Sequence, residues 1–176
     1  MYAYALQNPG RYIDPKGEYT LGDAYDHLVE NGVTPDTNTN LYGYSGHQLY
    51  DAWFELEHAD KGWHDSLPEP CPCNINDRGE GWIGPRLDIG QKYHPGGYQE
   101  IRKLSPDGSG AGRQCVYDRS GRLMTTAPAA GTADRHLPMS VFDPGSIRRH
   151  IIPDVNPYDL ALRLGREDEY LSLIHI

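Results

Sequence analysis

The sequence predicts a small α+β fold that is rich in loops, with two or three helices beside short antiparallel strands or hairpins. Two segments begin with helix-capping signals and continue with apolar residues at helical spacing, and two others are typical of strands. The 176 residues include 20 glycines and 14 prolines, which favour turns over a helical bundle. With 13 tyrosines and 2 phenylalanines, the core is expected to be small and half-exposed.

The first predicted helix follows the sequence Thr20-Leu21-Gly22-Asp23. A threonine followed three residues later by an acidic side chain is typical of a capping box, which satisfies the first free amides of a helix. Apolar residues then recur at helical spacing up to Val29, and Asn31-Gly32 is a stop signal. Ser45-Gly46-His47-Gln48 predicts a second capping box and a helix that ends near Ala59. The segment that starts at Asn156-Pro157 predicts the last helix, with Asn156 as the cap.

Strands are expected at 98–104 and in a hairpin over 114–125. Within this hairpin, Tyr117 and Asp118 end the first strand, Gly121 closes the turn, and Arg122 and Leu123 begin the return strand. The pattern favours a structural role for Tyr117 and Asp118 over a catalytic one.

The N-terminus reads YAYALQNPGRYIDPKG over residues 2–17. This segment resembles the end of the repeat-associated core of Rhs proteins, a family of tyrosine-aspartate repeats. The matching positions are Tyr2, Tyr4, Asn8, Pro9, Tyr12, Asp14, Pro15 and Gly17. The sequence Tyr117-Asp118-Arg119-Ser120-Gly121-Arg122-Leu123 resembles the repeat unit of the same family.

The resemblance implies two segments in this chain, and the codons of the last six residues indicate a third. Residues 1–17 would end the β-rich Rhs core, and residues 18–170 would be the variable C-terminal extension that in many members is a toxin or effector. Glu18 stands where self-cleaving members have leucine, so self-cleavage is not implied. The codons CTG TCT CTT ATA CAC ATC, which would encode residues 171–176, match a transposon end used in sequencing libraries. We therefore hypothesise that this tail is a sequencing adapter.

As an Rhs extension, the chain would act in competition between bacteria, secreted or delivered to a neighbouring cell as part of a larger protein. Its expected partners are the Rhs core shell of the parent chain and a cognate immunity protein. Two alternatives stay open: a binding or structural module of the shell without enzymatic activity, and an inactive remnant. The substrate and reaction are not predicted.

Charge and hydropathy limit the partners further. Residues 1–100 carry 16 acidic and 6 basic groups, which would repel a phosphate backbone, while residues 101–176 carry 9 and 10. Nucleic-acid binding is therefore not expected, because the arginines of the second half form no contiguous basic run. The sequence contains neither an apolar run of the roughly 20 residues that span a bilayer nor a signal peptide.

The candidate catalytic residues suggest a hydrolase of one of two kinds. In a cysteine hydrolase, Cys115 would be the nucleophile, His136 or His150 the base, and Asp134 or Asp154 the orienting carboxylate. In a metal-dependent hydrolase, the same histidines and aspartates would bind an ion that activates water. No short metal-ligand motif is present, so the cofactor is left unknown.

The cysteines leave further alternatives open. Because their number is odd, one disulfide to Cys115 would leave one free thiol. A structural zinc bound by Cys71, Cys73 and a histidine is the other alternative. Cys115 is also compatible with a small buried side chain in a strand.

Overall fold

A computed structural model describes residues 19–36, 43–60, 62–87, 94–138 and 144–174, so the expected Rhs core segment at 1–17 lies outside the described residues. The chain divides into two compact units. Unit 1 comprises Met1–Lys61 and Arg148–Tyr170, and unit 2 comprises Gly62–Ile147 and Leu171–Ile176. Each unit is described by itself below.

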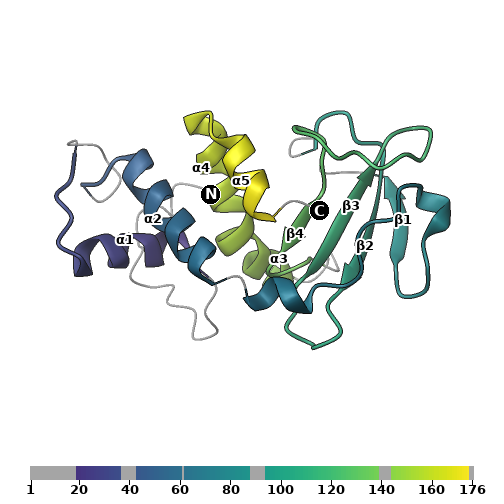
Figure 1. Ribbon diagram of the computed structural model, residues 1–176, viewed down its shortest axis with the longest axis horizontal. Coiled ribbons are helices and arrows are strands. Elements are labelled where there is room, and N and C mark those ends of the chain that lie inside the picture. The colour runs from purple at the N-terminus through teal and green to yellow at the C-terminus, as the bar shows by residue number, and fades with distance from the viewer. Residues whose placement is uncertain (1–18, 37–42, 61, 88–93, 139–143, 175–176) are drawn as a thin grey trace. The chain divides into compact units, whose positions relative to one another are not determined.

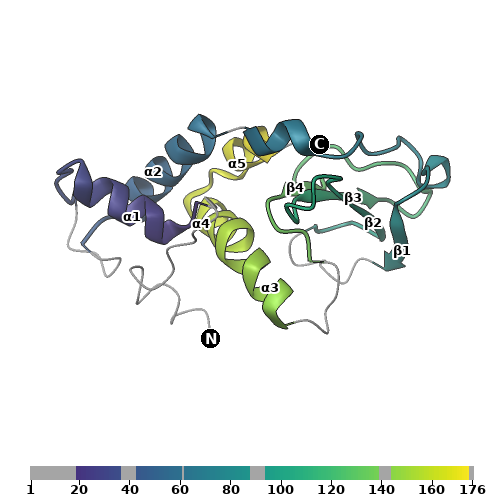
Figure 2. The same ribbon diagram turned by 90° about the horizontal axis from the view of Figure 1, so that it is seen from below.

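The helices of unit 1 begin as the capping signals predict. Helix α1 (Leu21–Glu30) starts at Thr20, whose hydroxyl accepts hydrogen bonds from the backbone amides of Gly22 and Asp23. The Asp23 carboxylate in turn accepts a hydrogen bond from the backbone amide of Thr20. Helix α2 (Gly46–Ala59) starts at Ser45 with the same reciprocal arrangement to Gln48. Both capping boxes are confirmed, and the two helices lie side by side (Figure 2).

The predicted last helix is present, but its expected cap is wrong. Helix α3 (Pro144–His150) runs into a π-helical turn (Ile151–Val155), which continues directly into α4 (Asn156–Leu164). Asn156 therefore enters α4 from backbone that is already helical, and no side chain caps that helix. Helix α5 (Glu167–Ile174) follows the turn at Gly165, whose φ of 69° suits glycine.

The core of unit 1 is aromatic. Trp53 is buried and stacks on Tyr170, with ring centroids 5.5 Å apart, and its indole Nε1 donates to the carbonyl of Tyr19. The Arg166 guanidinium lies over the ring of Tyr50 and also bonds Asp51. Tyr50 is fully buried, and this burial raises the pKa of its hydroxyl. These contacts tie α2 to the two C-terminal helices.

Unit 2 is built on a four-stranded antiparallel sheet in the order β1-β2-β3-β4 (Figure 1). The strands are β1 (Ile83–Leu87), β2 (Gln99–Leu104), β3 (Gly112–Tyr117) and β4 (Thr132–Asp134). Two short 3-10 helices, Gly62–Ser66 and Ile75–Asp77, precede β1.

The predicted α+β class is confirmed. The described residues hold five α-helices, whereas the sequence predicted two or three, because α3 and α5 lack a recognised cap signal. The expected strand at 98–104 is β2, and β3 is the first strand of the expected hairpin. Strands β1 and β4 lie in segments rich in glycine, proline and small residues, for which the sequence predicts no strand.

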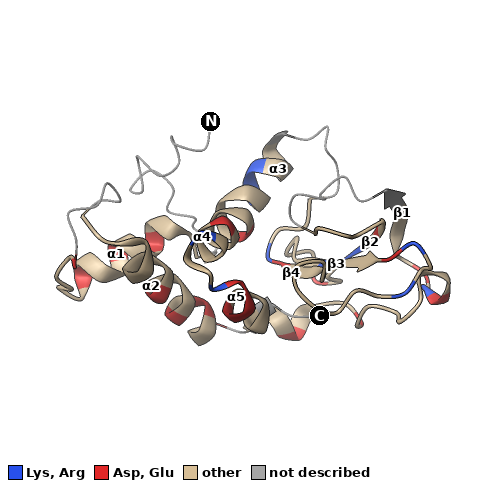
Figure 3. Cartoon of the chain, turned by 90° about the horizontal axis from the view of Figure 1, so that it is seen from above, with Lys and Arg blue, Asp and Glu red and all other residues tan. Residues whose placement is uncertain are grey.

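Acidic charge is concentrated in unit 1. That unit has 15 acidic and 7 basic residues, whereas unit 2 has 10 and 9. Figure 3 shows Asp and Glu along α1, α2 and α5. The negative charge of the chain is thus a property of the helical unit, and the sheet unit is nearly neutral. None of the described helices has the length and apolar character that crossing a membrane requires.

The core cluster of unit 2, which includes Ile101 and Trp82, contains a disulfide between Cys71 and Cys115. Cys115→Ser removes it and leaves a hydroxyl in the core, so the free energy of unfolding should fall by about 2–5 kcal/mol. Cys73→Ser is the matched control, because Cys73 is exposed and free, and it should change stability by less than about 0.5 kcal/mol. Chemical unfolding of both variants checks this, and equal stabilities would contradict the structure.

Candidate functional site

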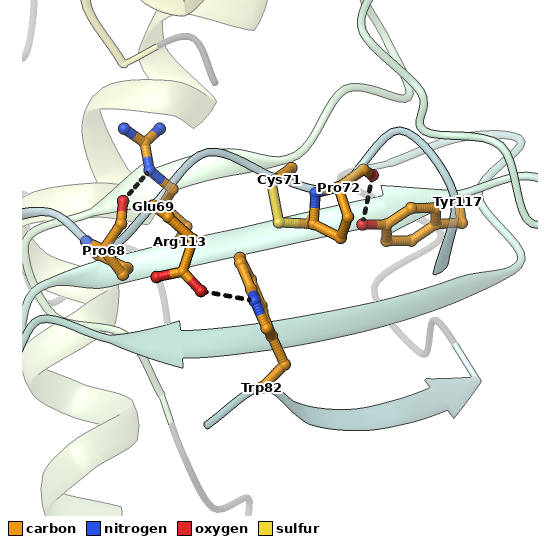
Figure 4. Close-up of a disulfide and its surroundings, with 8 residues drawn as sticks. Pro68, Glu69, Cys71, Pro72, Trp82, Arg113 and Tyr117 are labelled. Atoms are coloured by element: carbon orange, nitrogen blue, oxygen red, sulfur yellow. Dashed lines mark hydrogen bonds between the residues drawn. A yellow bond between two sulfur atoms is a disulfide. The ribbon is translucent and has the colours of Figure 1, made fainter. Parts of the chain in front are cut away.

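The disulfide decides between the cysteine hypotheses. Cys115 is fully buried in the middle of β3 and bonded to Cys71, which Figure 4 labels. Cys73 is the free thiol. The option of one bridge to Cys115 with one thiol left over is confirmed. A sulfur in a disulfide has no thiolate to attack a substrate, so Cys115 as the nucleophile of a hydrolase is wrong in this state. A zinc site that uses Cys71 is excluded for the same reason.

The segment around the disulfide is held against the sheet by polar contacts as well. The Tyr117 hydroxyl donates to the carbonyl of Pro72, the Arg113 Nε donates to that of Pro68, and the Trp82 indole donates to Glu69 (Figure 4). The pKa of Tyr117 is raised mainly by burial. This side of the sheet is therefore a closed structural layer with no candidate for catalysis.

The turn after β3 has the geometry that its sequence predicts. One Asp118 oxygen accepts hydrogen bonds from the backbone amides of Ser120 and Arg122 and from the Ser120 hydroxyl. The Gly121 amide donates to the carbonyl of Asp118, and Gly121 has a φ of 82°. The polypeptide then reverses direction, and Leu123 forms an isolated antiparallel β-bridge with Tyr117. In this structure Asp118 closes a turn, which agrees with the structural role expected for it.

The histidine and aspartate candidates fall into both units. In unit 1, His150 ends α3 and Asp154 lies in the π-helical turn, with Nδ1 and Oδ2 3.2 Å apart. Their side chains are 19% and 10% exposed. The Tyr170 hydroxyl donates to the carbonyl of Asp154 and fixes this turn to α5. The contact holds the imidazole in one orientation and offers two ligand atoms of types that bind zinc.

In unit 2, Asp134 ends β4 and is buried, and it accepts a hydrogen bond from the Thr132 hydroxyl. His136 follows two residues later and is also buried. Its ring packs on Gly110, where a side-chain carbon would lie 3.0 Å from Nδ1, so only glycine fits there without a shift. The structure thus places Asp134 and His136 beside the turn between β2 and β3.

The two faces of the sheet differ sharply in chemistry. Residues paired across antiparallel strands share a face. Ile101 pairs with Cys115 on one face, which we call the apolar face, and this face carries the core cluster. The other face carries Glu100, Arg102, Gln114, Thr132 and Asp134 beside the apolar Val116 and Leu104, and we call it the polar face after the first five.

A continuous chain of hydrogen bonds runs across the polar face. The Gln114 amide nitrogen lies 2.6 Å from Glu100 Oε2 and 3.3 Å from His94 Nε2. His94 Nδ1 lies 2.9 Å from the carbonyl of Ala130. Arg102 Nη2 lies 2.9 Å from Glu100 Oε1. The chain therefore joins an imidazole, an amide, a carboxylate and a guanidinium.

The hydrogen-bond partners of His94 determine which of its two ring nitrogens carries the proton. The carbonyl of Ala130 only accepts, so His94 Nδ1 carries the proton. Nε2 of the neutral ring then accepts from the Gln114 amide, whose second N–H donates to Glu100. Glu100 is 2% exposed and accepts from Gln114 through one oxygen and from Arg102 through the other. The arrangement provides a buried base and a cation side by side, a combination that can accept a proton or orient an anionic group.

The residues predicted from the sequence as site candidates do not include His94, Glu100, Arg102 or Gln114. One signal was available: Glu100 and Arg102 lie two residues apart in the segment predicted to be a strand, so they had to share a face. His94 and Gln114 gave no such signal, because their approach depends on the pairing of β2 with β3 and on a loop distant in sequence.

Asp118 predicts a specific pH dependence. Hydrogen bonds, first from the Ser120 hydroxyl, lower its pKa from 3.8 to about 2. A depressed carboxyl pKa stabilises the fold above the ordinary value, and this contribution is lost as the pH falls through about 2. Asp118→Asn should weaken the pH dependence of stability between those two values, whereas the exposed Asp77→Asn should leave it unchanged. Urea unfolding from pH 5 to 2 measures both, and parallel curves for the two variants would be contrary to this assignment.

Gln114 should be essential to the polar face. Gln114→Ala leaves Glu100 and His94 without their shared donor, so the free energy of unfolding should fall by about 1–3 kcal/mol. Gln99→Ala, on the neighbouring strand and on the opposite face, is the control and should cost less. Calorimetric unfolding compares them, and a larger loss for Gln99→Ala would refute the hydrogen-bond chain.

Comparisons with known proteins show no family for this chain. No protein family matches it, and no solved structure matches it significantly. It is similar in part to Protein mesh from Bombyx mori, with 36% identity over 62 residues. The match covers 31% of this chain and 4% of that protein, so the chain spans a small fraction of the length of this relative.

Proposed function

We propose that this chain is the C-terminal extension of an Rhs-type protein and acts as an effector in competition between bacteria. The observation that carries the proposal is the turn at 117–123. Its sequence resembles the Rhs repeat unit, and the positions that define the resemblance each have a structural role. Asp118 accepts the turn amides, Gly121 takes the positive φ, and Leu123 returns beside Tyr117.

The disulfide supports the proposed route of the protein. Disulfides persist in oxidising surroundings and are rare in reducing cytosol. The Cys71–Cys115 bond crosses the core of unit 2, at a sequence separation of 44 residues. A protein that is secreted or delivered to a neighbouring cell passes through such surroundings, and the bond would stabilise unit 2 on the way.

The polar face is our proposed reactive surface. Burying charged groups costs free energy, and an apolar layer would stabilise the sheet at least as well. A buried carboxylate, guanidinium and imidazole that are linked by hydrogen bonds are therefore more typical of a functional site than of a structural layer. With Cys115 in a disulfide, a hydrolase of this chain would activate water or a substrate hydroxyl. Glu100 is the proposed base, oriented by Gln114 and Arg102.

A growth assay tests the effector function. Induced expression of the 176-residue chain, with and without export to the oxidising periplasm, should stop growth of a sensitive bacterium. Glu100→Gln removes the base but keeps the shape, and it should restore growth. Glu80→Gln makes the same change at an exposed site in the same unit and should remain toxic.

The assay has clear contrary outcomes. Normal growth with folded, disulfide-bonded protein would reject the effector proposal and favour a binding module or an inactive remnant. Toxicity that survives Glu100→Gln would reject the polar face as the reactive surface while leaving the effector proposal standing.

A further inference from the structure

The chain of hydrogen bonds on the polar face includes one donor without an acceptor among the described residues. Arg102 donates through Nη2 to Glu100 and through Nη1 to the carbonyl of Pro138. Its Nε–H is buried and makes no hydrogen bond to any residue that the structure describes. The Arg102 side chain is 12% exposed, compared with 2% for Glu100. Arg102 is thus the more exposed member of the ion pair, although its Nε–H itself is covered, so a ligand that takes this N–H has to displace the groups that cover it.

A buried N–H without an acceptor is costly and calls for an explanation. The guanidinium presents its Nε–H and one terminal N–H along a single edge, a fork that matches two oxygens of a phosphate or carboxylate. In Arg102, Glu100 occupies only part of the guanidinium with one oxygen at 2.9 Å, while its other oxygen is bonded to Gln114. The pairing is therefore incomplete in a way that a tetrahedral anion could complete.

We propose that Arg102 binds a phosphate group of the substrate at the polar face. This inference rests on the proposed function and names the class of its substrate: a phosphate-bearing molecule. The phosphate would take the Nε–H and the N–H now directed to Glu100, and Glu100 would stay anchored by Gln114. Glu100 competes with the ligand for Arg102, so it limits the affinity for phosphate while placing a base beside the bound group.

Because Glu100 and phosphate compete for Arg102, substitutions at the two residues should change the affinity for phosphate in opposite directions. Arg102→Gln should weaken binding of inorganic phosphate at least about tenfold, because the cation is lost. Glu100→Gln should strengthen it, because Arg102 loses its competing carboxylate. Arg113→Gln is the matched control: Arg113 lies on the neighbouring strand, is partly buried, and faces the other side of the sheet, where it bonds Pro68. It should bind phosphate like the unaltered chain.

Titration of the full chain with inorganic phosphate, followed by calorimetry and by the amide NMR signals of β2 and β3, measures these affinities. Parallel titrations with adenosine monophosphate and a short RNA oligonucleotide distinguish a small nucleotide from a polynucleotide as the source of the phosphate. Unfolding curves confirm that each variant is folded, and if Arg102→Gln does not fold, the gain expected for Glu100→Gln still decides.

Equal affinities for the Arg102 and Arg113 variants, or no gain for Glu100→Gln, would overturn the inference, as would absence of phosphate binding to the unaltered chain. These results are independent of the growth assay. A chain that is toxic but does not bind phosphate would keep the proposed function and lose only this substrate class.

Discussion

The pairing of β2 with β3 is the constraint on which unit 2 depends. Its register places Ile101 opposite Cys115 and Arg102 opposite Gln114, so a single alignment creates both the apolar face and the polar face. A shift by one residue would turn the disulfide cysteine toward the charged groups and turn Glu100 into the apolar core. The disulfide and the hydrogen-bond chain therefore act together: each is compatible with one register alone, and each opposes slippage of the strands.

The same alternation of side chains explains how a closed core and the proposed reactive surface can lie on the two faces of one sheet. On the apolar face, a covalent bond and side-chain contacts to the backbone of Pro68 and Pro72 hold an irregular segment in place. Because that face supplies the stability, the polar face is free to carry groups that stabilise little. A buried carboxylate and guanidinium on a rigid sheet are held in fixed positions, and such preorganisation is what proton transfer and anion binding require.

Local signals in the sequence were sufficient for the helices that have caps and for the turn at Asp118. Thr20 and Ser45 act within three residues of themselves, and the turn is closed by neighbours of Asp118, so no distant contact was needed. Strand β4, by contrast, consists of Thr132-Ala133-Asp134, which has no strand pattern of its own and exists because β3 offers it an edge. The candidate Cys115 was misassigned for a similar reason: its partner Cys71 is brought to it only by the fold.

The central claim is that the polar face is retained for reaction and not for stability. A double variant, Glu100→Met with Arg102→Met, tests it most directly, because it replaces the ion pair by long apolar side chains. The account predicts that this variant stays folded and loses at most about 1–3 kcal/mol of stability, because the buried Gln114 amide loses its acceptor, and that it no longer inhibits growth. A stable variant that is still toxic would contradict the account.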